Sequence, residues 1–278
     1  PSSVNNLTVN NSAGLTLTSS ATVNGALGLT SGLITTGANT LTVVAAGSIT
    51  GGSSSSYVSG KLARGYSAIG SKTFPIGKGG NYRPLTLNYT ALTGASTVTV
   101  EQNEGALVGV LPTGVSLFGA RTWNVTQTGG SAFTYNITLD GTGFSPSNTA
   151  KAVILKKDGS ILSFPATFSS PNYTKTGLTS MSDFALGEDT GAPTGGSITY
   201  TNGFFTSLSV ALSYLTGTDD GSGLNLSTGK IQRSTASLSA GGVCASFSPF
   251  TDLVSEVDGS HTDTTVVSGT CYKYQYTI

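Results

Sequence analysis

The first fifty residues consist of short apolar-x-apolar units separated by glycine, asparagine or serine. The units occupy residues 4–11, 15–18, 22–25, 27–30, 32–35 and 41–44. No unit is long enough to bury a face by itself, so the units must stack on one another. A helix does not fit, because no 3.6-residue period is sustained. The pattern predicts a short β-solenoid or a meander of brief strands, with a disordered Ser/Thr linker as the alternative.

The composition suits a β-protein whose surface is solvated by hydroxyls and amides instead of charges. Only 9% of the residues are charged, against about 25% in an average globular protein. The 13 basic and 13 acidic residues cancel. A neutral chain lacks the concentrated positive field that nucleic acids and anionic membranes attract, so neither is expected as a partner. No apolar run approaches the length of about 18 residues that a membrane span needs, so we expect no membrane insertion.

The middle of the chain alternates candidate strands with turn signals, which is typical of a β-sandwich. The candidate strands are residues 85–89, 96–101, 121–127, 132–139, 150–156 and 184–186. Residues 156–159, Lys-Lys-Asp-Gly, predict a hairpin turn, and the Gly-Gly-Ser run at 51–56 predicts a linker or long turn. The sequence therefore divides into a repeat β segment at 1–56, a β-sandwich domain at 57–188 and a third domain at 189–278.

The last ten residues form a strictly alternating strand. Tyr272, Tyr274 and Tyr276 point to one side, as in a half-buried strand. No further strand follows Ile278 in the sequence given, so this strand has a potential open edge. Other candidate strands of the third domain are residues 197–201, 208–215, 230–233, 244–247 and about 264–267.

The two cysteines both lie in the third domain, each on a candidate strand. We expect Cys244 and Cys271 to form a disulfide, with two buried thiols as the alternative. A disulfide would indicate an oxidising compartment. The chain is therefore expected to be secreted.

Two stretches of sequence resemble known families. The Asn/Thr/Gly/Leu repeats, Tyr-Val-Ser-Gly at 57–60 and Phe-Pro-Ile-Gly-Lys-Gly-Gly-Asn-Tyr-Arg-Pro-Leu at 74–85 resemble large cell-surface proteins of Bacteroidetes-type bacteria. Those proteins are secreted, multidomain and adhesin-like, which implies an extracellular or cell-surface location in a bacterium. Residues 217–224, Gly-Thr-Asp-Asp-Gly-Ser-Gly-Leu, resemble bacterial immunoglobulin-like or fibronectin-type-III-like modules. In those modules the Tyr-x-Tyr pattern falls on the penultimate strand, so the resemblance implies an Ig-like sandwich lacking its last strand.

Catalytic constellations are missing from the sequence, and we expect no enzyme activity and no catalytic cofactor. The chain has a single histidine, His261, in a polar segment, and a nucleophilic triad usually needs histidine as its base. Glycosidase chemistry needs two facing carboxylates, for which Glu101 with Glu104, or Asp219 with Asp220, are the candidates. The Gly-Lys-Gly-Gly run at 77–80 lacks the phosphate-loop spacing and precedes no helix.

Calcium is the one ligand that the acidic residues suggest. Asp189, Asp219 and Asp220 carry hard oxygen donors near the boundary of the third domain, where a cation would stiffen the joint. Ordinary turn carboxylates are the alternative.

We expect the chain to be a structural subunit or stalk segment of an extracellular bacterial filament or adhesin. A strand from another copy would complete the open edge formed by Tyr272, Tyr274, Tyr276 and Ile278. The strand donor would be the amino-terminal stretch that carries Val4, Leu7 and Val9. Head-to-tail completion does not close on itself, so it would produce a polymer. The alternative is that a further segment of a longer chain provides the strand.

A surface that binds glycan or ice is the competing function. Exposed aromatic side chains at Tyr66, Tyr82 and Tyr173 would stack on sugars. Threonines of the repeats, Thr16, Thr18 and Thr30, would form a flat ordered face. The competing function requires each of these sets to be exposed and to share one surface.

Overall fold

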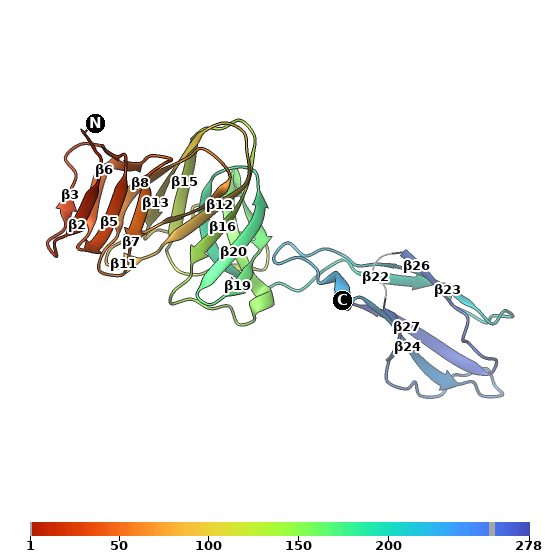
Figure 1. The fold of residues 1–278 in the computed structure, drawn as a ribbon. Helices are drawn as coiled ribbons and strands as arrows, with labels where there is room; N and C mark the ends of the chain where they lie inside the picture. Colours follow the sequence, from red (N-terminus) through yellow and green to blue (C-terminus); the bar gives the residue numbers. More distant parts are fainter. Residues whose placement is uncertain (1, 256–258) are drawn as a thin grey trace. The chain divides into compact units, whose positions relative to one another are not determined.

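The computed structural model describes residues 2–255 and 259–278, and it confirms the all-β expectation (Figure 1). Strands hold 57% of the residues and helical turns 2%. The helical residues of the described ranges form two short 3-10 turns, η1 (Thr149–Lys151) and η2 (Leu226–Thr228). The chain forms two compact units, one ending at Thr190 and one spanning Gly191–Ile278.

The first unit begins with a β-solenoid of about four turns. Its strands are β1 (Ser2–Val4), β2 (Leu7–Asn10), β3 (Leu15–Thr16), β4 (Ala21–Val23), β5 (Ala26–Ser31), β6 (Ile34–Val43), β7 (Ser48–Gly51) and β8 (Val58–Tyr66). All pair in parallel with the strand one coil away. Ser2 faces Ala21, Ala21 faces Leu41 and Leu41 faces Leu62, so successive coils are offset by about 20 residues. Each coil therefore contains several of the short apolar units.

Apolar side chains stack in columns inside the solenoid. One column runs through Val4, Val23 and Val43, which register pairing places above one another. Val23 and Val43 are fully buried, whereas Val4 in the first coil is 42% exposed. The next position in the column is Arg64, whose Nη1 donates a hydrogen bond of 2.6 Å to the carbonyl oxygen of Thr73. The buried guanidinium thus ends the apolar column where the solenoid meets the following sheet.

The solenoid continues into a β-sandwich without a break in its sheet. Strand β8 pairs in parallel with β6 on one side and antiparallel with β13 on the other, and the sheet proceeds through β15, β21, β17 and β18. The structure therefore places the predicted segments 1–56 and 57–188 in one compact unit. The Gly-Gly-Ser run is a tight turn of this unit, with backbone bonds between Ser53 and Ser56.

A second sheet, in the order β19-β20-β16-β12-β9, packs against the first (Figure 1). Trp123 from β15, Tyr135 from β16 and Phe184 from β21 are fully buried between the two sheets. The remaining strands of this unit are β9 (Gly70–Phe74), β10 (Ile76–Lys78), β11 (Asn81–Tyr82), β12 (Leu85–Leu92), β13 (Ser96–Asn103), β14 (Val115–Leu117), β15 (Thr122–Gly129), β16 (Phe133–Asp140), β17 (Ala152–Asp158), β18 (Ser160–Pro165), β19 (Thr167–Ser169), β20 (Asn172–Leu178) and β21 (Asp183–Asp189).

Two hairpin turns account for the motifs at residues 77–80 and 156–159. Lys78 pairs with Asn81 across Gly79 and Gly80, whose φ angles are 58° and 83°. Positive φ at both central positions is the type I′ hairpin turn, which strongly favours glycine. Asp158 pairs with Ser160 across Gly159, which confirms the predicted hairpin there.

The second unit holds two three-stranded sheets, β22-β23-β26 and β25-β24-β27 (Figure 1). Its strands are β22 (Ser197–Tyr200), β23 (Val210–Leu215), β24 (Lys230–Ser237), β25 (Thr251–Ser255), β26 (Gly259–Asp263) and β27 (Thr270–Thr277). The expectation of a strand at 244–247 was wrong, because the segment makes only one bridge, between Cys244 and Leu238, and scattered backbone bonds to β24, such as that from the Ala245 N–H to the Ser237 carbonyl. The strand expected near 264–267 lies earlier, because Asp263 Oδ1 accepts the backbone N–H of Thr265 and turns the chain.

Glycine corners allow the coils of the solenoid to approach closely. Gly32 has a φ of +84°, and a Cβ added there would lie 1.8 Å from the carbonyl oxygen of Asn11 in the coil above. Gly37 also has a positive φ, +59°, but a Cβ there would meet nothing within 4 Å. A comparison of alanine substitutions at Gly32 and Gly37 therefore distinguishes the free-energy cost of a left-handed backbone conformation from that of a steric clash.

We expect Gly32→Ala to destabilise the first unit far more than Gly37→Ala. The Gly37 variant bears only the left-handed backbone penalty of about 1–2 kcal/mol. The Gly32 variant adds a backbone clash and should lose at least about 3 kcal/mol. Urea unfolding followed by the fluorescence of Trp123, the single tryptophan, measures both variants. Equal losses would show that the coils do not stack as described.

Candidate functional site at an open sheet edge

Strand β27 has a neighbour on one side only. It pairs antiparallel with β24 over its whole length, from Thr270 opposite Ser237 to Thr277 opposite Lys230. In residues 2–255 and 259–278, no strand pairs with its other edge. In an antiparallel strand alternate residues direct their N–H and C=O groups to opposite sides, so this edge presents a row of backbone donors and acceptors.

Half-buried apolar side chains border the open edge. Tyr272, Tyr274 and Tyr276 face the interior of the unit, as the alternation predicts, but only Tyr274 is buried, while the other two and Ile278 are half-buried. From the facing sheet, the Tyr200 ring of β22 lies 5.2 Å from that of Tyr274. The core is therefore thinly covered along this rim.

The order of strands in the second unit matches an Ig-like sandwich without its final strand. Strands β22, β23 and β26 occupy the positions of strands A, B and E, and β24 and β27 those of C and F. The Tyr272 hydroxyl accepts the backbone N–H of Val267 at 2.7 Å, which is the tyrosine corner found at the start of strand F. The position beside β27, where strand G would pair, is the open edge.

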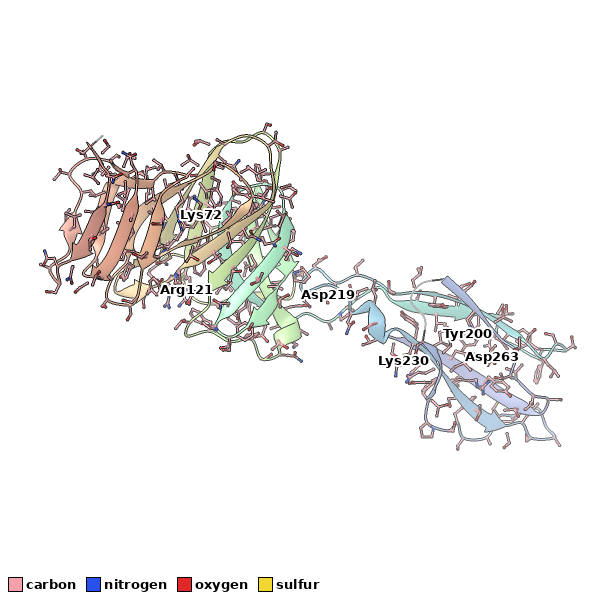
Figure 2. The ribbon with its side chains drawn as sticks, viewed as in Figure 1. Lys72, Arg121, Tyr200, Asp219, Lys230 and Asp263 are labelled. Carbon is pink, nitrogen blue, oxygen red and sulfur yellow. A yellow bond between two sulfur atoms is a disulfide. The ribbon has the colours of Figure 1, made fainter. Side chains whose placement is uncertain are left out.

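A buried carboxylate ties the two sheets together beneath this edge. Asp263 of β26 is 1% exposed, and its Oδ2 accepts hydrogen bonds from Arg233 Nη1 at 2.7 Å and from the Tyr274 hydroxyl at 2.9 Å. Figure 2 labels Asp263 and Tyr200 in the second unit. Burial raises the pKa of the Asp263 carboxyl, but hydrogen bonds from Thr265, Arg233 and Tyr274 outweigh it, so the net pKa lies below the usual value. Burial, and then the bond to Asp263, raises the pKa of the Tyr274 hydroxyl.

We expect the second unit to lose stability in acid through Asp263. A carboxyl whose pKa is lower in the folded state stabilises the fold above its unfolded pKa of about 3.9, and this contribution is lost as the pH falls through the folded pKa. Asp263→Asn should lower the free energy of unfolding by about 2–3 kcal/mol at neutral pH. It should also flatten the loss below about pH 4. Calorimetry across that range tests this, with Trp123 fluorescence marking the first unit; an unchanged acid slope would contradict it.

The predicted disulfide is present. Cys244 and Cys271 are joined, with 6.0 Å between their Cα atoms and 27 residues of sequence separation. The bond fixes the start of β27 to the loop that follows β24.

Reducing this bond should destabilise the second unit and leave the first unit unchanged. Opening a loop of this size removes about 3–4 kcal/mol of stabilisation on the chain-entropy model. Calorimetry with and without reductant, beside a Cys244→Ser/Cys271→Ser variant that should match the reduced protein, measures the effect. A reduced protein as stable as the oxidised one would contradict the prediction.

The predicted donor stretch is part of the solenoid instead of a free arm. Val4 lies in β1, which pairs with β4, and Leu7 and Val9 lie in β2, which pairs with β5. Val9 is 5% exposed and Leu7 packs against the core. This coil has a neighbouring coil on one side only, because no strand of the described residues pairs with the outer edges of β1 and β2. Donation of this stretch therefore requires the first coil to leave the stack.

The three acidic residues proposed for calcium do not form a site within either unit. Asp189 is buried in β21 of the first unit, opposite Val115. Asp219 and Asp220 belong to the second unit, where Asp219 Oδ1 accepts the backbone N–H of Gly221 at 2.7 Å. Among the residues that the structure describes, no three metal-ligating side chains gather. Calcium binding stays an untested prediction.

The aromatic surface expected for glycan does not form as expected. Tyr66 and Tyr173 are buried, so the expectation that they are exposed platforms was wrong, and Tyr82 is half-buried beside Tyr57. Both buried tyrosines pack with other aromatic rings. Thr16 in β3, Thr30 in β5 and Thr18 between strands are all exposed, and ice binding by them stays an untested prediction.

Two cations of the first unit that Figure 2 labels, the half-buried Lys72 and the buried Arg121, bind backbone carbonyls. Lys72 Nζ donates to the carbonyls of Ala45 and Gly65 at 2.8 and 2.7 Å. Arg121 Nη1 donates to the carbonyl of Thr142 at 3.1 Å. Burial, followed by the neighbouring Arg83, lowers the pKa of Arg121 to about 10. These contacts join loops to sheets and give the cations a structural role.

The sequence did not reveal the group around Asp263. Arg233 was assigned only to a candidate strand, and Asp263 to a polar segment beside His261. The structure places His261 in β26, opposite Leu212, and buries Asp263 at the end of that strand. The sequence did contain one signal, because Arg233 lies two residues after the apolar Ile231 and so faces the same side of the strand. A cation that faces the interior needs a buried acceptor.

Comparison with known family models, curated proteins and solved structures finds no match. The described residues contain no helix long and apolar enough to cross a membrane. The protein is thus defined by its fold: a β-solenoid that merges into a β-sandwich, and a second unit of two three-stranded sheets with one disulfide.

Proposed function

We propose that this protein is a structural subunit or stalk segment of an extracellular bacterial filament or adhesin, joined head to tail by β-strand complementation. The observation that carries the proposal is the open edge of β27 with its rim of half-buried tyrosines. An added strand would form main-chain bonds along the edge, and its inward side chains would cover Tyr272 and Tyr276. Such an edge left open is prone to uncontrolled pairing, so a dedicated partner is favoured.

The first coil of a second copy is the proposed donor. Residues 3–10 match the eight residues of β27 in length. In an extended conformation Leu7 and Val9 fall on one face, where they would enter the rim, and polar residues dominate the other. Among the described strands this coil is held by one neighbouring coil, so it opens at lower cost than a coil held on both sides.

The disulfide and the low charge support the extracellular location. A disulfide persists in oxidising compartments and is rare in the bacterial cytosol. The bacterial and adhesin-like part of the proposal rests on the sequence resemblance at residues 57–60 and 74–85. No second function is proposed, because no observed surface favours glycan or ice.

The test is the mass of the purified chain in solution, together with a peptide of residues 2–11. We expect concentration-dependent oligomers in sedimentation velocity. An excess of the peptide should lower the oligomer fraction at least tenfold and raise the melting temperature of the second unit. Hydrogen exchange should show the β27 amides that face away from β24 protected in the oligomer and exposed in the monomer.

A peptide with aspartate in place of Leu7 and Val9 is the matched control, and it should neither inhibit assembly nor stabilise the second unit. Head-to-tail complementation would be overturned by a chain that stays monomeric at high concentration and whose second unit keeps the same melting temperature with the peptide. A monomer in which these outward-facing β27 amides are already protected would show that its own chain covers the edge.

A further inference from the structure

One end of the second unit is built from loops that contain no charged residue, although Lys273 and Arg233 reach the Phe247 ring and the Thr265 hydroxyl from the strands. Three connections meet there, at residues 201–209, 238–250 and 264–269, and none contains Asp, Glu, Lys, Arg or His. The register places them together: Tyr200 and Val210 flank the first, Ser237 and Thr270 pair at the second, and Asp263 begins the third. We call these three segments the charge-free tip.

Large apolar side chains project from the charge-free tip. Phe204 is 83% exposed and Val243 68%, and Phe205, Leu208 and Val267 are exposed as well. The first two loops are neighbours, since a Cβ at Gly242 would lie 3.7 Å from Phe204 Cζ. Exposed apolar side chains gathered without charges are typical of the core of a protein–protein interface.

The direction of an added strand leads to this tip. A strand that continues the antiparallel pattern would start beside Thr277 and end beside Thr270. Thr270 adjoins the tip, so the polypeptide that follows the donor strand emerges there. After a donor that ends at Asn10, residues 11–14 precede β3, and they span at most about 14 Å.

The solenoid carries no charged side chain before its last strand, which suits it to this position. The first charged residue of the chain is Lys61 in β8, so strands β3 to β7, which follow the donor strand, contain none. Two uncharged surfaces can be buried together without the desolvation cost that an unpaired charge imposes.

We propose that the charge-free tip is the docking surface for the solenoid of the copy that donates the strand. This inference rests on the proposed function and adds a second contact, with an orientation, to the strand exchange. The apolar side chains of Phe204, Leu208 and Val243 pack against the coils that follow the donated strand. The interface contains no ion pairs, so its strength does not depend on salt.

The test places two lysines in the tip of the full chain. Phe204→Lys/Val243→Lys changes two exposed side chains on two of the loops, and it should weaken self-association at least tenfold. The matched control is Ile69→Lys/Val110→Lys, which adds the same charge at side chains 62% and 90% exposed in the first unit. The control should associate like the unaltered chain.

The peptide of residues 2–11 separates the two proposals. If the tip variant still binds the peptide and no longer associates, the edge is intact and the tip contact is supported. If the tip variant associates as strongly as the control, the tip contact is wrong although strand exchange stands. If the unaltered chain neither associates nor binds the peptide, both proposals fail.

Salt provides an independent readout on the unaltered chain. Between about 50 and 500 mM NaCl, over which exposed charge pairs are strongly screened, the association constant should stay within twofold. A loss of tenfold or more across this range would show that charged groups hold the copies together and would overturn the charge-free contact.

Discussion

The constraint behind the whole structure is that the edge of a β-strand needs a backbone partner. In the first unit, each coil of the solenoid covers the edges of the coil before it, and β8 ends the stack by pairing with β13 of the sandwich. This change from parallel to antiparallel pairing covers the last coil with the next sheet. Several edges stay uncovered among the described strands, including those of β18, β22 and β25, and the proposed assembly uses two of the uncovered edges, the first coil and β27.

The parts of the fold that local patterns control were predictable. Short apolar units with glycine corners specify stacked coils, and the alternating tyrosines of residues 272–276 specify the inward face of β27. The long-range pairing was not predictable from these patterns. No local signal shows that β8 belongs to both the solenoid and the sandwich, because its pattern of inward-facing residues is compatible with a strand of either. The amino-terminal stretch was predicted as a strand donated to another copy, but Val9 is buried in the solenoid, since the same alternation that suits strand donation also suits a coil.

Charged residues are distributed unevenly along the chain, and the solenoid and the second unit are stabilised by different interactions. In the solenoid, burial of apolar columns and backbone bonds suffice, and the first cation, at residue 61, appears where the columns end. In the second unit, a single buried carboxylate at Asp263 links β26 to β24 and β27. The apolar core there is small and open along one rim. The hydrogen bonds of Asp263 to both strands therefore help to align the two sheets, an alignment that apolar packing provides in the first unit.

The disulfide changes how the second unit would carry mechanical load. If tension is applied between Gly191 and Ile278, the covalent path runs along the chain to Cys244, crosses to Cys271 and leaves through β27. Residues 245–270, which include β25 and β26, lie outside that path and cannot be drawn out while the bond is intact. Thr277 at the end of β27 lies opposite Lys230 at the start of β24, so a pull would load both strands at the same end and open their ladder one bond after another.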